Sequence, residues 1–238
     1  LKAFHHCIPV SPDQDAMFKT LTEAKAVANP DDIIVVWPGT YAEGNLLKDG
    51  VNWFFMPGAV VAPAPDVTIF DDGGAAVNST IFGMGEFQPS GDAAGVVSSH
   101  AGTRLNITCK KFKGTCAGRF LIQGGAGSVI IDCQELNNDG TGGIVLSGYN
   151  GVTRITCPYI ISTGGDGQAF FVSLGTLIVY SQNIVIEDSV YAIAVEGGCM
   201  DLTSQTFSSD GADYGIYVQM AGIFTGFFNR FIVINCTA

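Results

Sequence analysis

The segments LNITC (Leu105–Cys109), VIIDC (Val129–Cys133) and TRITC (Thr153–Cys157) follow one another at an interval of 24 residues. In each segment, apolar or small residues alternate with mixed ones, which is the pattern of a β-strand with one buried face. Equivalent segments continue towards the C-terminus at 177–181, 200–204 and 224–228. The chain therefore repeats one short strand at a nearly constant interval.

Two further features repeat in the same register. One is a second apolar strand at 120–122, 144–146, 170–172, 193–195 and 216–218; the other is a single apolar position, occupied by Phe112, Leu136, Ile160, Ile184, Phe207 and Phe231. Such a repeat is one rung of a β-solenoid, whose rungs stack ~4.8 Å apart. The leucine-rich signature is absent, and propeller blades need about 40 residues each. We therefore expect an all-β fold, a right-handed single-stranded parallel β-helix of about eight coils.

The seven cysteines are odd in number and form no CxxC pair, so they predict neither a disulfide framework nor a zinc site. The repeat places Cys109, Cys133 and Cys157 at the same position of consecutive coils, and Ser181 and Ser204 continue the series. We expect an inward ladder of small, unpaired thiols.

Residues 1–31 are expected to form an N-terminal segment with a short capping α-helix, and residues 32–238 one continuous β-helix domain. Ser11–Gln14 has the residue types of a helix start, and Asn29-Pro30 those of a helix end. The sequence therefore predicts a helix over 12–29 that covers the first rung. The expected core-facing side of this helix consists of Met17, Leu21, Ala24 and Ala28.

The stretches FKTLTEA (Phe18–Ala24) and DIIVVWPGTYAE (Asp32–Glu43) resemble the opening of pectin-lyase-like β-helix proteins. In that superfamily an amphipathic helix covers the first rung and a P-G-T-Y turn follows the first strand. The rungs around Asp49–Ala59 and Ile81–Phe87 resemble those of its phage and viral surface members, which are tailspike-like. The resemblance implies the β-helix fold. It implies no single activity, because the superfamily holds lyases, hydrolases, esterases, adhesins and virion parts.

The catalytic sets of this superfamily are incomplete in the sequence. Pectate lyases use an arginine base beside calcium-binding carboxylates, and no Lys or Arg lies between Arg154 and Arg230. The methylesterase context G-x-V-D-F-I-F-G is absent, and the polygalacturonase motifs N-T-D, D-D, G-H-G and R-I-K are matched only in part. The nearest catalytic candidates are Asp139, Asp166 and Glu196, since paired carboxylates can perform acid–base glycoside hydrolysis.

Carboxylates recur at one turn of the repeat. Asp139, Asp166, Asp188 and Asp210 each precede the second strand of their coil by 4 to 6 residues. Stacked coils would align them along one ridge, and hard cations such as calcium favour such oxygen clusters. The simpler interpretation is that Asp is a good turn residue beside Gly. Calcium is the one cofactor that the sequence suggests.

Charge and hydropathy restrict the partners. A net charge of −11 argues against nucleic acid, and no apolar run is long enough for membrane insertion. Five basic residues lie between Arg104 and Arg119, where a solvated face is the simplest interpretation. The positive mean hydropathy of +0.32 favours self-association as a homotrimer or larger assembly. The outward-facing apolar positions expected to contribute are Ile130, Ile178, Tyr180 and Phe227.

Together these features favour a non-enzymatic structural or recognition protein that displays or binds glycan. The resemblance places it on a virus or phage surface, or elsewhere outside the cell. A polysaccharide lyase or glycoside hydrolase is one alternative, and a secreted carbohydrate-binding adhesin module is another. The candidate binding residues are Asp188, Asp210, Tyr149, Tyr180 and Tyr217, the tyrosines as stacking platforms for sugars.

Overall fold

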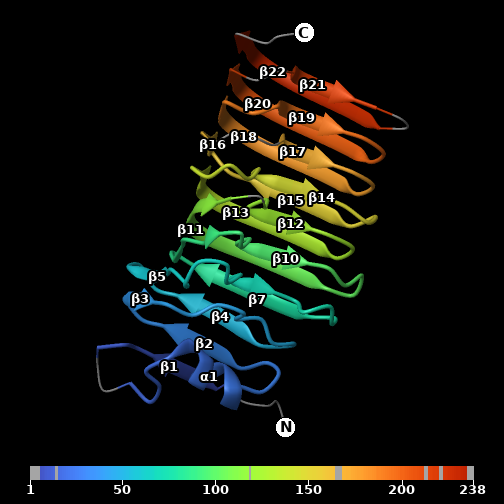
Figure 1. The fold of residues 1–238 in the computed structure, drawn as a ribbon. Coiled ribbons are helices and arrows are strands. Elements are labelled where there is room, and N and C mark those ends of the chain that lie inside the picture. Colours follow the sequence, from blue (N-terminus) through green and yellow to red (C-terminus); the bar gives the residue numbers. More distant parts are fainter. Residues whose placement is uncertain are drawn as a thin grey trace.

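The protein is a parallel β-solenoid of about nine turns with one short helix (Figure 1). The computed structural model describes residues 6–13, 16–117, 119–163, 168–211, 214–219 and 222–234. The predicted parallel β-helix is confirmed, with about nine turns in place of eight. Part of the difference is strand β1 (Cys7–Val10), which pairs in parallel with β2 although the sequence assigned these residues to a terminal segment.

Two sheets run along the solenoid. Neighbouring strands of the first sheet are β1, β2 (Ile33–Val36), β4 (Asn52–Phe55), β7 (Asn78–Gly83), β11 (Arg104–Cys116), β13 (Ser128–Asn138), β15 (Val152–Thr156), β18 (Thr176–Glu187), β20 (Cys199–Asp210) and β22 (Ile223–Ile234). Shorter strands pair beside this path: β3 (Gly39–Tyr41), β5 (Ala59–Val61), β8 (Glu86–Phe87), β9 (Ser90–Gly91) and β16 (Tyr159–Ser162). The seven-stranded sheet consists of β6 (Phe70–Asp71), β10 (Val96–Ser98), β12 (Ile122–Gly124), β14 (Val145–Ser147), β17 (Gln168–Val172), β19 (Tyr191–Val195) and β21 (Tyr214–Val218).

The core is built from rows of equivalent side chains. The predicted apolar row is in register from coil to coil and fully buried from Phe112 to Phe207, whereas Phe231 on β22 is 45% exposed. In the seven-stranded sheet, Ile122 and Ile193 belong to a second buried row that also contains Val145 and Phe170. Stacking of equivalent coils thus places apolar residues of one repeat against those of the next.

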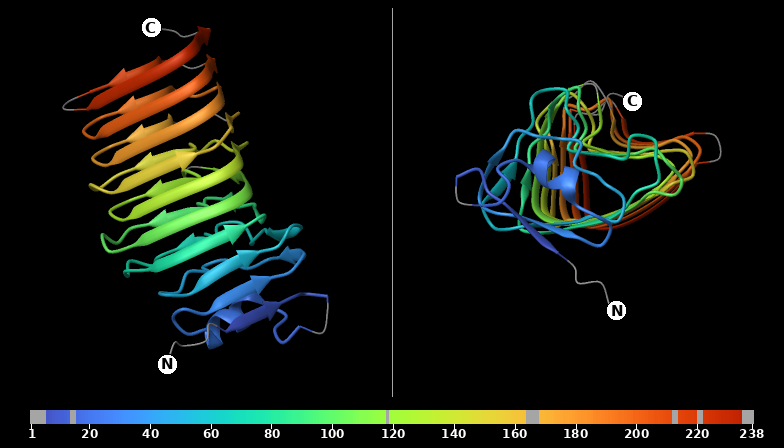
Figure 2. Two further views of the ribbon diagram at one scale, coloured as in Figure 1. Left: turned by 180° about the vertical axis from the view of Figure 1, so that it is seen from behind. Right: turned by 90° about the horizontal axis from the view of Figure 1, so that it is seen from below.

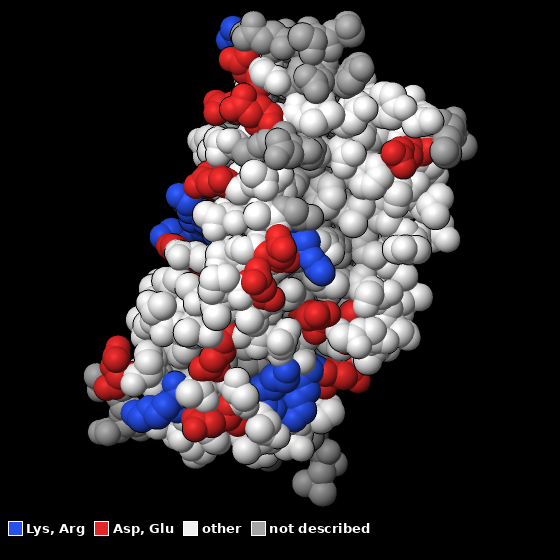
Figure 3. All heavy atoms as spheres, in the orientation of Figure 1, with Lys and Arg blue, Asp and Glu red and all other residues white. Residues whose placement is uncertain are grey.

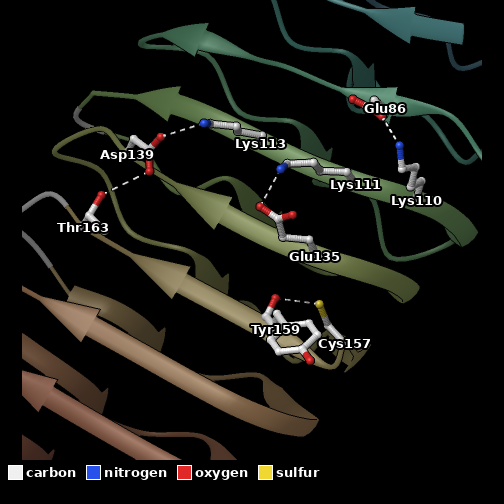
Figure 4. A network of polar contacts seen from close by, with 9 residues as sticks. All are labelled: Glu86, Lys110, Lys111, Lys113, Glu135, Asp139, Cys157, Tyr159 and Thr163. Carbon is white, nitrogen blue, oxygen red and sulfur yellow. Dashed lines mark hydrogen bonds and ion pairs between the residues drawn. The ribbon is translucent and has the colours of Figure 1, made fainter. Parts of the chain in front are cut away.

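The cysteine ladder is confirmed. Cys109 and Cys133 are in register, and both are buried free thiols, as is Cys157. The Sγ of Cys157 donates to the carbonyl of Tyr159 at 3.1 Å (Figure 4). Interaction with the Cys133 thiol and burial raise the pKa of Cys157, so the thiol stays protonated.

The capping helix is shorter than predicted. Helix α1 covers Leu21–Val27, and its N-cap is Thr20, which forms a capping box with Glu23. The expectation of a helix over 12–29 with Met17 facing the core is wrong, since Met17 is 76% exposed. The chain before Thr20 instead returns to β1, where the Ser11 N–H donates to the Phe18 carbonyl at 3.1 Å. The other three predicted contact residues are buried: Leu21, Ala24 and Ala28.

Both ends of α1 are fixed to the adjoining coil. The Thr22 N–H at the N-terminal end donates to the Glu43 carboxylate at 2.7 Å. At the other end, the Lys48 ammonium donates to the carbonyls of Lys25 at 2.9 Å and Ala28 at 2.6 Å. Each charge has the sign that the helix dipole favours at that end. The helix therefore lies across the end of the solenoid, as the view along the axis shows (Figure 2).

Candidate functional site

Asp139, the first catalytic candidate, is held in a structural network (Figure 4). Its carboxylate lies 3.3 Å from the Lys113 ammonium and accepts a hydrogen bond from the Thr163 hydroxyl at 3.2 Å. The neighbouring lysines are also paired, since Lys110 contacts Glu86 and Lys111 contacts Glu135, each at 2.6 Å. These three lysines of the basic stretch are therefore balanced by carboxylates of adjacent coils.

The structure does not bring Asp139 and Glu196 together. Asp139 directly follows β13 and precedes β14, whereas Glu196 directly follows β19 at the opposite end of the strands of the seven-stranded sheet. Strands β14 and β19 are two rungs apart, which alone amounts to about 10 Å along the axis. Carboxylate pairs of glycosidases lie within about 9.5 Å. The third candidate, Asp166, lies outside the described residues.

The acidic turn differs from the predicted ridge. Asp210 is in register with Glu187, which the sequence analysis missed, and not with Asp188. Asp188 lies just beyond the strand with a φ of 53°, and its N–H donates to the Asp210 carbonyl at 3.0 Å. Within the described ranges, no group of three or more His, Cys, Asp or Glu side chains is arranged to hold a metal ion. Calcium binding by Asp139, Asp166, Asp188 and Asp210 stays a prediction.

Two of the three candidate tyrosines lie on different sheets, and the third lies in a turn. Tyr180 is on β18 of the first sheet, where the Arg154 guanidinium lies 5.5 Å from its ring centroid. Tyr217 is on β21 of the seven-stranded sheet, with its ring 5.0 Å from that of Tyr191. Tyr149 projects from the turn after β14 and is 76% exposed. Tyr149 and Tyr217 therefore belong to one surface, and Tyr180 to another.

The outer face of the seven-stranded sheet is uncharged from β10 to β21. One row of in-register residues runs along it, and the aromatic ring of Phe171 in this row stacks on that of Phe120 at 6.2 Å. The space-filling view shows a broad uncharged area on the right of the molecule, with acidic side chains near its margins (Figure 3). The row consists of Val97, Gln123, Leu146, Phe171, Ala194 and Tyr217.

Turn lengths create a notch at one edge of this face. Where the chain returns from the seven-stranded sheet to the first sheet, successive turns span five residues (99–103), three (125–127), four (148–151) and three (173–175). The short turn 125–127 thus lies between two longer ones, and the hollow above it has a volume of about 350 Å³. We call this hollow the notch. Its lining is Val97, Ser98, Ser99, Gln123, Gly125, Ala126, Leu146, Gly148, Tyr149 and Ser173.

One wall of the notch is fixed by a buried carboxylate. Asp72 accepts hydrogen bonds from Ser99 N–H at 2.8 Å, Ser99 Oγ at 2.6 Å, His100 N–H at 2.9 Å and Thr103 Oγ1 at 2.8 Å. Burial acts to raise the pKa of Asp72, but these hydrogen bonds and one from Gly74 outweigh it, so the pKa lies below its ordinary value. Asp72 is therefore ionised at neutral pH and holds the 99–103 turn in place.

The opposite wall contains an unusual backbone conformation. Tyr149 and Asn150 have φ angles of 51° and 61°, in the left-handed region that bulky side chains rarely adopt. Such conformations cost free energy and persist where the surrounding structure imposes them, often at functional sites. The extra residue of the 148–151 turn and this conformation together project the Tyr149 side chain beside the notch.

Of the ten residues that line the notch, the sequence analysis proposed Tyr149 as a binding residue and missed the other nine, among them Gln123, Leu146 and Ser99. The available signal was the difference in turn length between coils. Comparisons of the chain with protein-family models, curated proteins and solved structures give no match. In the described part of the chain, the one helix has seven residues and is too short to cross a membrane.

Proposed function

We propose that the chain is a non-enzymatic structural and recognition solenoid that binds polysaccharide on the outer face of its seven-stranded sheet. The observation that carries the proposal is the uncharged row with aromatic residues, which ends at the notch beside Tyr149. Aromatic rings stack on the apolar faces of sugars, and neutral amides and hydroxyls pair with sugar hydroxyls. Membership of the pectin-lyase-like superfamily and a place on a virus, phage or other extracellular surface are part of the proposal.

The carboxylate geometry favours binding over cleavage. A hydrolase needs a proton donor and a base held across the scissile bond. Asp139 is engaged by Lys113 and Thr163, and Glu196 lies at the opposite end of the strands of the seven-stranded sheet. These two residues therefore do not form an acid–base pair.

A combined binding and cleavage assay tests the proposal. The 238-residue chain is incubated with a panel of neutral and acidic polysaccharides, with and without calcium, while binding, new reducing ends and unsaturated products are measured. We expect binding to at least one polysaccharide without product release. Tyr149→Ala should weaken this binding, whereas Tyr159→Ala, which removes a 51% exposed tyrosine on β16, should not. Product release that disappears in Asp139→Ala, or absence of binding across the panel, would contradict the proposal.

A further inference from the structure

We propose that the notch is a binding site for one unit of an uncharged saccharide. Tyr149 stacks on the sugar ring, and Gln123 forms hydrogen bonds with its hydroxyls. This inference rests on the proposed function and names its ligand class.

The shape of the notch suits a small ligand. Its floor is the turn Gly125–Gly127, in which Ala126 has the largest side chain, so that a ligand can approach the backbone closely. The walls are the longer turns 99–103 and 148–151. A volume of about 350 Å³ is at the small end of the range of ligand sites in proteins, which begins at roughly 300 Å³. The notch therefore fits a sugar unit and not a large cofactor.

The hydrogen-bonding groups of the notch are neutral and include both donors and acceptors. Gln123 carries an amide, which offers two N–H donors and an acceptor oxygen. The Ser99 hydroxyl donates to Asp72 at 2.6 Å, which leaves its oxygen to accept from a ligand. Ser173 adds a further hydroxyl. The hydroxyls of a sugar can donate to and accept from these groups, while Leu146 and Tyr149 cover the apolar face of the sugar ring.

The charge of the notch disfavours acidic sugars. All the described residues that line the notch are uncharged, so a uronic-acid carboxylate entering it would lose hydration without gaining a cationic partner. The whole chain carries a net charge of −11 and repels polyanions. An uncharged saccharide suffers neither the loss of carboxylate hydration nor the charge repulsion.

The walls are held in place before a ligand binds. Asp72 fixes the 99–103 turn through Ser99, His100 and Thr103. The other wall, the 148–151 turn, is tied to the neighbouring coil by the Gly148 N–H, which donates to the Gly124 carbonyl at 2.8 Å. A preorganised site loses less conformational entropy on binding.

Calorimetric titration with matched oligosaccharides tests this inference. The probes are galactose, glucose and mannose oligomers and a galacturonic acid oligomer of the same length. We expect a neutral oligomer to bind and the galacturonic acid oligomer not to bind. Tyr149→Ala should weaken binding about tenfold through loss of stacking. Ala126→Trp should abolish it by filling the floor, whereas the control Tyr159→Ala should bind as the unaltered chain does. Circular dichroism and the thermal midpoint establish that each variant folds.

The outcomes separate this inference from the proposed function. Tighter binding of the galacturonic acid oligomer, or neutral binding that survives both Tyr149→Ala and Ala126→Trp, would overturn the notch assignment and leave polysaccharide binding intact. Absence of binding for every polysaccharide and oligomer would overturn both.

Discussion

Cys157, Ser181 and Ser204 occupy equivalent positions of three coils, which we call the corner: Cys157 lies between β15 and β16, and Ser181 and Ser204 are in register within β18 and β20. Each side chain donates to the carbonyl two residues further on, which belongs to Tyr159, Asn183 and Thr206 respectively. The corner therefore needs a small residue with a donor, which both Cys and Ser provide. The 24-residue spacing was sufficient to predict the ladder. Why both Cys and Ser occur at this position became clear only from the positions of the carbonyls.

This equivalence predicts that Cys157→Ser is tolerated and Cys157→Leu is not. The serine hydroxyl can donate to the Tyr159 carbonyl, so the free energy of unfolding should fall by less than about 1 kcal/mol. Leucine overfills the corner and removes the donor, at a cost of about 1–3 kcal/mol. Urea unfolding measures both changes. Equal destabilisation by the two substitutions would show that the donor is unimportant.

Asp72 carries a prediction with a defined pH dependence. Asp72→Ala removes the acceptor for Ser99, His100 and Thr103, so the free energy of unfolding at pH 7 should fall by about 3 kcal/mol. Because the folded-state pKa lies below the ordinary 3.8, the carboxylate stabilises the fold above that pH and loses its effect as the pH falls through the lowered pKa. Unfolding measured from pH 7 to pH 2 should show the two proteins converging. A difference that is constant with pH would contradict this role.

At the scale of elements, the cap shows where sequence patterns are ambiguous. Ser11–Gln14 and Thr20–Glu23 both have the residue types of a helix start, and the structure uses the second. At the first, the Ser11 N–H donates instead to the Phe18 carbonyl beside β1. Tertiary pairing of β1 therefore decides between two local signals of similar strength.

The cap predicts a clear effect of truncation. Removal of residues 1–30 exposes the edge of β2 and the buried Ile34 and Val36. An uncovered strand edge with apolar core beside it promotes association, so the shortened protein should aggregate. Size-exclusion chromatography and sedimentation measure this. A stable monomer that lacks these residues would refute the capping role.

The turns show a second limit of sequence-based prediction. The sequence predicted Tyr149 as a candidate binding residue, but it did not predict the notch. The lengths of turns 99–103, 125–127 and 148–151 have meaning only when the strand register shows that these turns stack on one another. A one-residue offset likewise moved the acidic turn, where Glu187 and not Asp188 is in register with Asp210.

At the scale of the whole molecule, the repeat made the fold predictable but did not predict the properties of the outer surfaces. The same positions of every coil face the core, so a few rows of equivalent residues were enough to predict the solenoid. The outer surfaces follow no such rule. Lys110, Lys111 and Lys113 pair with carboxylates on one side, whereas the strands of the seven-stranded sheet from β10 to β21 carry no charged residue. The proposed saccharide binding therefore depends on the irregular outward residues and turns.

Self-association of the 238-residue chain is the prediction at this scale. The C-terminal coil exposes several apolar side chains, among them Phe227 at 65% and Ile223 at 58%. Burial of this surface in a homotrimer or larger assembly would stabilise the complex through the hydrophobic effect. Light scattering at micromolar concentration should give a mass well above the 24.9 kDa of one chain. A mass equal to one chain would count against the prediction.

The most direct test of the central claim, recognition of saccharide at the notch, is hydrogen–deuterium exchange with and without a saturating neutral oligosaccharide that binds in the titration. We predict slower exchange of the backbone amides in 123–126 and 148–151, with exchange unchanged around Asp139 and at Glu187–Asp188. Slower exchange at those acidic residues, with the notch amides unaffected, would contradict the claim.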